Sequence, residues 1–418
     1  MNEKNAQEIA YRRLACKLFD KGKSATQILR QIPHSRSWLF KWKGRFAEGG
    51  WAALASGSTA PKASPQSYPP AVRQLVCRVR RRLQRAEVGL WGARAVFLEL
   101  HRNRLVKVVP SRSTINRWLR AAGCFSGAAP QGSPAYYPAL QGADGVLVAS
   151  CDWLARYVEG GEKVLCFHTL EHRSHTLSQT LATDKPAPTA CHHLLQSFQE
   201  VGVADFLQID NDAAFTGLGK QGRGFGRFVR LALYCGVELI FLPPGEPKRK
   251  GLVERVNGLW VSSFWNKNRF AAAREVKKKS QKFLAWYDSY CPPSLEGVSV
   301  QEARRLHPRK KLRPQEVGRV PEKLPLTAGR VHFLRKVDSP GAIAIWHERF
   351  RVSKRLTGQY VFATIDLRQK RLQIAYRRSP RATAKVLKQF PYRLTEPLKP
   401  LHSQYRRRKR RVRVLQII

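Results

Sequence analysis

Three carboxylates stand near the ends of expected structural elements in a strongly basic chain. Asp152 and Asp210 each follow an apolar run typical of a strand that they are expected to close, and Glu254 lies on an expected helix. Their separations, 210 − 152 = 58 and 254 − 210 = 44 residues, are too wide for local contact, so only the fold could bring them together. Carboxylate oxygens suit Mg²⁺, and two such ions can stabilise both the attacking and the leaving oxygen of a phosphodiester. The pattern therefore predicts a site for two Mg²⁺ ions, with Mn²⁺ able to substitute.

Each acid also has an ordinary structural interpretation. Asp152 could cap the end of its strand, and Asp210 could stabilise its own turn, because an Asp-Asn pair favours turns. Glu254 could pair with a nearby Lys or Arg. Taken singly, each structural interpretation is as good as a catalytic one.

The polar residues next to these acids are interpreted as structural. Asp212 is expected to serve its own turn rather than to act as an auxiliary metal ligand. His168 and His172 would share a face only on a helix, and their segment has the pattern of a strand and a turn. We therefore assign structural roles to both, and to His175.

The segment around Glu254 predicts a strand, a loop and a helix in succession. Val237–Leu242 is an apolar, β-prone run that stops at Pro243-Pro244, and a helix is expected to begin beyond a loop of Gly, Pro, Lys and Arg. One helical turn places Asn257 on the face of Glu254, where it could contact DNA or orient the acid. The loop residues expected to hold the DNA strand that enters the site are Lys248, Arg249 and Lys250.

The formal net charge of +47 and the pI near 10.8 dominate the composition of the 418-residue chain. So many uncompensated cations repel one another unless a polyanion is nearby, which makes nucleic acid the natural partner. A solvated basic surface without function would not explain basic segments in every part of the chain, and a membrane-surface role lacks a strongly amphipathic stretch. The length predicts three or four domains.

Cysteine usage and hydropathy bear on the compartment. The eight cysteines are scattered, without a CxxC pair or zinc-finger spacing, which is typical of a reduced cytosolic protein. No apolar run reaches about 20 residues, and the first residues lack a signal-peptide core. We therefore expect a cytoplasmic protein that is neither exported nor membrane-spanning.

Residues 1–55 predict three short helices. The first spans Ile9–Asp20, Ser24 can cap a second helix through Leu29, and Ser35 can cap a third. The short turn between the second and third predicts a helix-turn-helix, in competition with a plain helical bundle. The residues that the third helix would present to a DNA major groove are Arg36, Ser37 and Lys41.

Residues 71–124 predict a second unit of this kind, after a Pro- and Ser-rich linker over residues 56–70. A strongly basic helix, Val72–Arg85, precedes a helix over Ala93–Leu100 and a third segment with a Ser cap and Gly123 as its stop. Two helix-turn-helix units on a linker can bind a long site more tightly than either alone. The residues available to DNA here are Arg112, Thr114, Asn116 and Arg117.

Beyond a second linker at residues 125–143, strands and helices alternate, which predicts a mixed α/β core over residues 144–310. Short β-type runs separated by turns then predict a small β-barrel over residues 322–380. Residues 381–418 are assigned to a basic tail, whose densest run, Tyr405–Val414, is expected to order only on meeting phosphate. The Gly-rich insert at residues 216–227 has no assigned function.

Five motifs occur in a recognisable order along the chain. They are S-C-D-W at Asp152, E-H-R-S-H from Glu171, I-D-N-D-A-A-F at Asp210, P-P-G-E-P-K-R-K-G-L-V-E-R-V-N-G at Glu254, and Y-D-S-Y-C-P-P-S-L-E-G-V-S-V-Q-E-A. In this order they resemble the motifs of the DDE transposases of bacterial insertion sequences, of the helix-turn-helix-bearing kind with a retroviral-integrase-like core. The resemblance covers nearly all of the chain.

The chain departs from these family motifs at a few positions. Ala149 stands where the family often has Trp, His175 replaces Arg, and Asp212 replaces Gly. The last motif lacks the family's His, which weakens that match.

The resemblance implies an RNase H-like core whose metal ligands here would be Asp152, Asp210 and Glu254. It implies attack by metal-activated water on a phosphodiester at the element's end, followed by attack of the freed 3′-hydroxyl on target DNA, without a covalent enzyme intermediate. The implied partner is double-stranded DNA, as element ends and as target, bound by a homo-oligomer that assembles on it. A bacterial, nucleoid-associated protein is the implied setting.

Two other function classes compete with this hypothesis. A catalytically silent DNA-binding regulator, derived from a transposase, would keep both helix-turn-helix units and discard the catalysis; the spacing and context of the acids argue against it. A tyrosine recombinase would need an H-x-x-R motif and a nucleophilic Tyr. The chain has His101–Arg104 in the second DNA-binding region and Tyr405 in the basic tail, which is a poor match.

Overall fold

The computed structural model describes residues 3–55, 68–124, 146–183, 186–217, 223–246, 251–379, 382–402 and 405. The chain forms two compact units, Met1–Pro69 and Pro70–Ile418. No helix within the described ranges is sufficiently long and apolar to traverse a bilayer.

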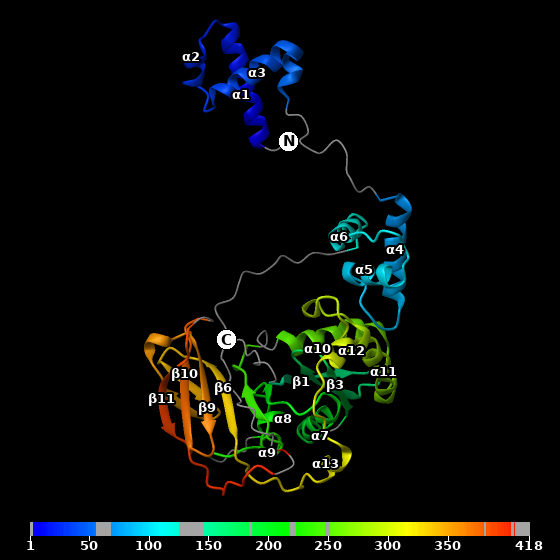
Figure 1. The fold of residues 1–418 in the computed structure, drawn as a ribbon, viewed down its shortest axis with the longest axis vertical. Helices are drawn as coiled ribbons and strands as arrows, with labels where there is room; N and C mark the ends of the chain where they lie inside the picture. Colours follow the sequence, from blue (N-terminus) through cyan, green and yellow to red (C-terminus); the bar gives the residue numbers. More distant parts are fainter. Residues whose placement is uncertain are drawn as a thin grey trace. The chain divides into compact units, whose positions relative to one another are not determined.

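The first unit contains three α-helices; the starts of the second and third agree with the predicted caps, whereas the first begins at Glu3, earlier than the expected Ile9. They are α1 (Glu3–Asp20), α2 (Ala25–Leu29) and α3 (Arg36–Gly49). The side chain of Ser24 accepts from Gln27 N in a capping box, and that of Ser35 accepts from Trp38 N, so both helix starts are encoded locally. The three helices pack together (Figure 1), and Ile28 and Leu39 are buried in the small core that they share.

The second unit begins with three further helices, α4 (Pro70–Arg85), α5 (Ala93–Arg102) and α6 (Arg112–Ala121). Their core contains Val76, Leu100 and Ile115, all fully buried. Ser111 caps α6 by accepting from Thr114 N, as its sequence predicts. These helices correspond closely to the segments expected from periodicity.

Hydrogen bonds join this helical group to the rest of the second unit. Lys267 Nζ donates to the carbonyls of Leu83 and Ala86, at 2.9 and 2.8 Å, where α4 ends. The Arg94 guanidinium donates to the Cys291 carbonyl at 2.9 Å. A cation at a helix C-terminus satisfies carbonyls that have no partner within the helix, so the contact is favourable on both sides.

A large mixed sheet forms the centre of the second unit. Its strand order is β11-β10-β9-β6-β5-β4-β1-β2-β3, with β2 antiparallel to both of its neighbours, β1 and β3, and with β1, β4 and β5 parallel. The first five strands are β1 (Val148–Tyr157), β2 (Lys163–Glu171), β3 (Leu177–Ala182), β4 (Phe206–Ile209) and β5 (Glu238–Phe241). Such a sheet with flanking helices is compatible with the integrase-like core that the motifs imply.

Helices cover both faces of these strands (Figure 1). One face packs on α7 (Pro186–Glu200), α8 (Ala213–Thr216) and α9 (Arg227–Tyr234). The other face packs on α10 (Gly251–Ser263), α11 (Ala273–Ser289) and α12 (Val300–Leu306). Because side chains alternate along a strand, Ala149 and Cys151 of β1 point toward the first group, and residue 152 points toward the second.

The C-terminal strands correct the prediction of a separate barrel over residues 322–380. After α13 (Pro314–Gly318), β6 (Arg330–Lys336) pairs in parallel with β5 and so continues the central sheet, and only a short hairpin lies apart from it. Val331 and Phe333 of β6 are fully buried in the same core as Leu239 and Phe241 of β5. By pairing with β5, β6 covers a strand edge of the central sheet that would otherwise be exposed.

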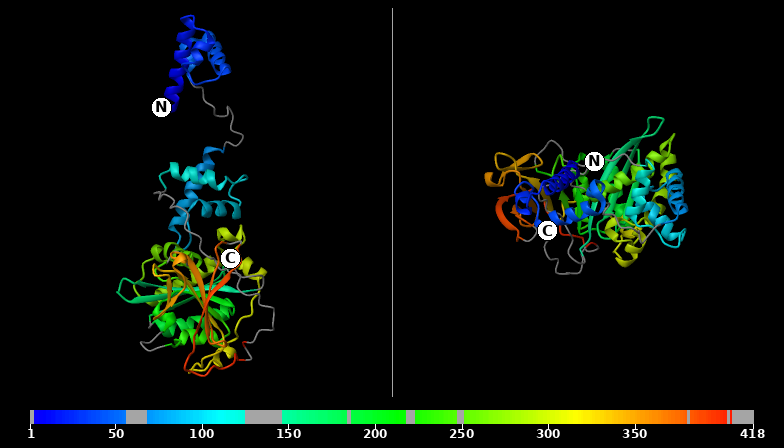
Figure 2. Two further views of the ribbon diagram at one scale, coloured as in Figure 1. Left: turned by 90° about the vertical axis from the view of Figure 1, so that its left-hand side faces the viewer. Right: turned by 90° about the horizontal axis from the view of Figure 1, so that it is seen from above.

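The remaining strands lie at the end of the sheet away from β3 and α11 (Figures 1 and 2). They are β9 (Tyr360–Asp366), β10 (Arg371–Tyr376) and β11 (Lys385–Pro391), and the separate hairpin consists of β7 (Ala342–Ile345) and β8 (Glu348–Arg351). β11 lies inside the segment assigned to a basic tail, and Tyr405 is buried against Tyr234, so that assignment is wrong for these residues. Residues 406–418, with most of the basic run, lie outside the described residues.

Candidate active site

A row of polar side chains crosses the face of the sheet that α10 and α11 cover. The register pairs Asp152 on β1 with His168 on β2, and His168 with Gln179 on β3. All three residues are buried. Buried polar groups need hydrogen-bond partners, so this row is either a linked network or a source of instability.

The parallel pairing of β1 with β4 extends the row toward the second acid. Ser150 pairs with Gln208, an offset of 208 − 150 = 58 residues, and their side chains are hydrogen-bonded at 3.1 Å. The same offset leads from Asp152 to Asp210, the residue after β4. The strand register therefore places these two acids on neighbouring chain segments, in keeping with the expectation that the fold brings them together.

One detail of that expectation is wrong: Asp152 does not close its strand. β1 continues to Tyr157 because its second half pairs with β2, up to Tyr157 opposite Lys163. Its pairing with β4, in contrast, ends at Ser150. Asp152 thus lies in the middle of a strand, just past the point where β4 stops pairing, and only 8 % of its surface is exposed.

Asn257 on α10 connects Asp152 to His168. Its Nδ2 donates to Asp152 Oδ2 at 2.9 Å, and its Oδ1 lies 2.7 Å from His168 Nδ1. The sequence predicts that Asn257 could contact DNA or orient Glu254, the acid on its own helix, whereas the hydrogen bond seen here is to Asp152 on β1. Burial lowers the pKa of His168 to about 4, so the imidazole is neutral at physiological pH.

The Asp210 turn is held by its own backbone. Asp212 N donates to Asp210 Oδ1 at 2.9 Å, and the Asp212 side chain accepts from Ala214 N at 2.8 Å to cap α8. Asp212 therefore serves the turn, as predicted. The structural interpretation of Asp210 as a turn residue is also met in part, because its carboxylate accepts the hydrogen bond from Asp212 N.

Arg335 is a residue near this turn that the sequence analysis did not identify. It lies on β6, is 3 % exposed, and donates to Asn211 Oδ1 at 2.7 Å and to the carbonyl of Leu242 at 2.9 Å. Its Nε also donates to the Ala344 carbonyl. One guanidinium thus joins the residue after Asp210 to the end of β5. The only feature of the sequence that could have pointed to Arg335 is an Arg within a predicted strand, and this feature does not indicate which residues the side chain contacts.

Glu254 lies in the first turn of α10, where the helix dipole favours a carboxylate. The donor types of the three acids fit Mg²⁺, which prefers oxygen ligands. Among the described residues, however, no group of three or more His, Cys, Asp or Glu side chains could hold a metal ion. The three acids therefore do not form a closed ligand set in this arrangement, and their role as metal ligands stays a prediction.

Besides Asn257, the residues assigned to DNA contact divide into three groups. Arg36, Ser37 and Lys41 are exposed on the first half of α3. On α6, Arg112 and Arg117 are exposed, whereas Thr114 and Asn116 are half-buried, and the Thr114 hydroxyl lies 3.0 Å from that of Ser111. Lys248, Arg249 and Lys250 lie outside the described residues.

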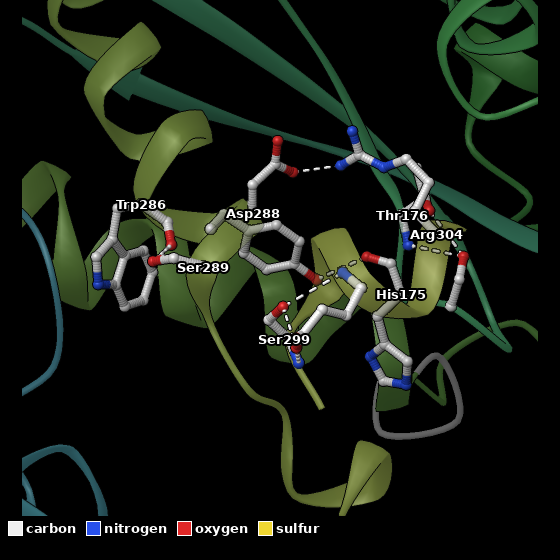
Figure 3. A network of polar contacts seen from close by, with 10 residues as sticks. His175, Thr176, Trp286, Asp288, Ser289, Ser299 and Arg304 are labelled. Atoms are coloured by element: carbon white, nitrogen blue, oxygen red, sulfur yellow. Dashed lines mark hydrogen bonds and ion pairs between the residues drawn. The ribbon is translucent and has the colours of Figure 1, made fainter. Parts of the chain in front are cut away.

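The E-H-R-S-H motif forms a turn between β2 and β3. Glu171 is buried and accepts from Arg173 N at 2.9 Å and from Ser174 N at 2.6 Å. The carbonyl of His175 accepts from the Tyr287 hydroxyl at 3.2 Å. Figure 3 shows this turn beside the end of α11 and the start of α12, where Asp288 pairs with Arg304. The second and fifth motifs thus support one another structurally.

A second buried histidine, His193 on α7, belongs to a separate network on the opposite face of the sheet. Its ring nitrogens lie 2.8 Å from the Thr169 hydroxyl and 2.7 Å from the Thr180 hydroxyl. Burial lowers the pKa of His193 to about 3. The imidazole of an unfolded chain takes up a proton near pH 6.5. The unfolded state thus binds more protons than the folded state below that pH, and stability falls as pH falls.

We expect the free energy of unfolding to decrease as pH is lowered from about 6.5 toward 4.5. His193→Gln should make this decrease shallower, because Gln takes up no proton in either state, while other buried histidines such as His168 maintain the rest. Urea unfolding at a series of pH values measures it. His101→Gln, at an exposed site on α5, is the control and should keep the full decrease. An unchanged slope in His193→Gln would contradict the assignment.

Comparison with known proteins gives matches only among solved structures. No protein-family model matches the chain, and no curated protein matches it. The catalytic core domain of HTLV-2 integrase in complex with magnesium, in its dimeric form, is 15 % identical, covers 37 % of this chain and 94 % of that one, and has a TM-score of 0.28. Its trimeric form is 14 % identical, covers 39 % and 99 %, and has a TM-score of 0.29.

A longer match is the simian T-cell lymphotropic virus intasome in complex with PP2A regulatory subunit B56 gamma. It is 16 % identical, covers 72 % of this chain and 92 % of that one, and has a TM-score of 0.33. These scores are low, so the proposals for this protein stand on its own residues.

Proposed function

We propose that this protein is a DNA transposase or integrase of the DDE type, which cleaves DNA at element ends and joins the 3′-hydroxyl to target DNA. The observation that carries the proposal is the placement of its acid motifs. The register between β1 and β4 places Asp152 and Asp210 on neighbouring segments. The helix that carries Glu254 contributes the Asn257 amide that is hydrogen-bonded to Asp152. Motifs separated by 58 and 44 residues along the chain, 210 − 152 and 254 − 210, thus belong to two adjoining central strands and to one helix that covers them.

In this proposal the three acids hold divalent metal ions. Bound Mg²⁺ would supply charge stabilisation to the attacking and leaving oxygens. The chain itself orients the carboxylates, through Asn257 for Asp152 and through the backbone of Asp212 for Asp210. It also provides a cationic surface for the polyanionic substrate, in keeping with its net charge of +47.

The helical units are proposed to bind the element ends. α2 and α3 form a short pair, and α5 and α6 a second, with Arg36, Lys41, Arg112 and Arg117 exposed on the later helix of each pair. Exposed cations near the start of such a helix are placed as in helix-turn-helix readers of the major groove. We propose that a homo-oligomer assembles on the DNA, because the two ends of an element must be processed together.

The direct test is a joining reaction with purified protein, Mg²⁺, a labelled duplex that carries the element end, and a target plasmid. Joining that depends on the three acids supports the proposal. A protein that binds the ends but never cleaves or joins them would instead be the silent regulator. Terminal inverted repeats beside the coding region would identify the end sequence to use.

DNA binding should weaken steeply with salt. A protein that contacts about 6–10 phosphates loses about 10³–10⁵-fold in affinity between 50 and 200 mM salt. Titration of a labelled duplex at several salt concentrations gives the log–log slope. Arg117→Gln should reduce that slope by about 1 if Arg117 contacts phosphate. Arg349→Gln is the matched control, because the Arg349 charge is already paired with Asp338. A flat salt dependence would rule out phosphate-dominated binding.

A further inference from the structure

The hydrogen-bonded chain that ends at Asp152 has a defined direction. Gln179 Nε2, an N–H donor, lies 2.8 Å from His168 Nε2, which must therefore accept. The proton of the neutral ring is then on Nδ1, which donates to Asn257 Oδ1. With its oxygen engaged in this way, the Asn257 amide presents Nδ2 to Asp152 Oδ2. Each bond in the chain thus fixes the polarity of the next.

The hydrogen-bonded row is also anchored at the end away from Asp152. Ser280 on α11 donates its hydroxyl proton to Gln179 Oε1, which fixes which end of the Gln179 amide faces His168. His168 is fully buried and Gln179 is 7 % exposed. A cross-strand row thus links α11 to β1, and its central member, His168, is shielded from bulk water.

An apolar row would serve stability at least as well. The neighbouring positions on the same face, Leu170 and Leu177, pack with α10 and α11 as ordinary core residues. Burying a His and a Gln among them costs desolvation free energy that their hydrogen bonds only offset. The polar row therefore suggests a role in directing the Asn257 amide, and through it the Asp152 carboxylate.

We propose that His168 and Gln179 are positioning residues that hold the Asp152 carboxylate, through the Asn257 amide, in the orientation that its chemistry needs. This inference rests on the proposed function, because it takes Asp152 to be one of the reacting site's acids. It assigns a role to a histidine that sequence patterns leave as a core residue.

The first measurement needs no substitution. In ¹⁵N-histidine-labelled full-length protein, the ¹⁵N shifts of His168, identified by its loss in His168→Asn, should show the Nδ1–H tautomer at neutral pH. Protonation at Nε2 instead would overturn the proposal, because the direction of the hydrogen-bonded chain would be reversed.

The second measurement is the affinity for Mn²⁺ in the absence of DNA. The electron paramagnetic resonance signal of free Mn²⁺ monitors the binding. Loss of residues that orient metal ligands typically weakens metal binding or activity by about 10–100-fold. His168→Leu should therefore bind Mn²⁺ at least about tenfold more weakly than wild type. His168→Asn should recover most of the affinity, because its amide N–H can replace the Nδ1–H donor. Gln179→Leu should give an intermediate loss.

His193→Leu is the matched control for these variants. It removes an equally buried imidazole, carried by α7, which packs on the same sheet from the face away from Asp152. It should lower the unfolding free energy and leave Mn²⁺ affinity within about twofold of wild type. Equal losses of Mn²⁺ affinity in His168→Leu and His193→Leu, or none in His168→Leu, would overturn the proposal.

Failure of this inference can be separated from failure of the proposed function. Asp152→Asn should abolish both joining and most Mn²⁺ binding; a fully active Asp152→Asn protein would refute the proposed function itself. An inactive Asp152→Asn protein together with unimpaired His168→Leu would refute only the positioning role.

Discussion

Asp210→Asn should leave end binding intact and reduce strand joining about a thousandfold or more. Stabilisation of transition-state charge by a bound metal amounts to several kcal/mol, and each 1.4 kcal/mol corresponds to about tenfold in rate. An amide keeps the size of the side chain and can still accept from Asp212 N through its oxygen, so the turn should survive. Joining to a target plasmid measures the rate, and a gel-shift titration with the same duplex measures binding.

Asp212→Asn is a closely matched control for this variant, two residues away in the same turn. Asp212 caps α8, and Asn caps helix starts about as well as Asp does. Its joining activity should stay within a few-fold of wild type. An active Asp210→Asn protein would remove Asp210 from the site, and with it the DDE assignment. Equal losses in both variants would mean that the turn, and not the Asp210 charge, had been measured.

Arg335→Met should lower the free energy of unfolding by on the order of 3 kcal/mol, because it leaves buried acceptors without their charged donor. The acceptors concerned include the Leu242 carbonyl and Asn211 Oδ1. Met keeps much of the volume of the side chain, so the effect should come from lost hydrogen bonds more than from a cavity. Urea unfolding followed by tryptophan fluorescence measures it.

The functional consequence of Arg335→Met should exceed the loss of stability. Asn211 follows Asp210 directly, so joining per folded molecule should also fall at temperatures where the variant is fully folded. Arg349→Met is the control: Arg349 is an exposed arginine on β8 paired with Asp338, and exposed pairs contribute about 0–1 kcal/mol. If the two variants lost equal stability, Arg335 would not have the special role inferred from its burial.

The boundary of the core illustrates the limits of sequence patterns. Turn signals and alternating residues correctly indicate strands such as β6 and β9, but they also suggest a small barrel, because short strands with tight turns are common to both arrangements. The pairing of Leu239 with Val331 decides between them, and it depends on which strand edges are exposed after the core has folded. Except for the β7–β8 hairpin, the strands beyond residue 322 therefore belong to the sheet that contains Asp152.

By itself the sequence determined what is local: the Ser caps of α2, α3 and α6, the periodicity of most helices and strands, the basic charge, and the order of the acid motifs. These follow from interactions within a few residues or from composition alone. Only the tertiary structure decided that Asp152 lies within a strand, opposite His168 and bonded to Asn257, and that Arg335 reaches the Asp210 turn. Such partners are 16 to 124 residues apart, 168 − 152 and 335 − 211. They are selected by strand register and by the need of buried polar groups for partners, which no short stretch of sequence encodes.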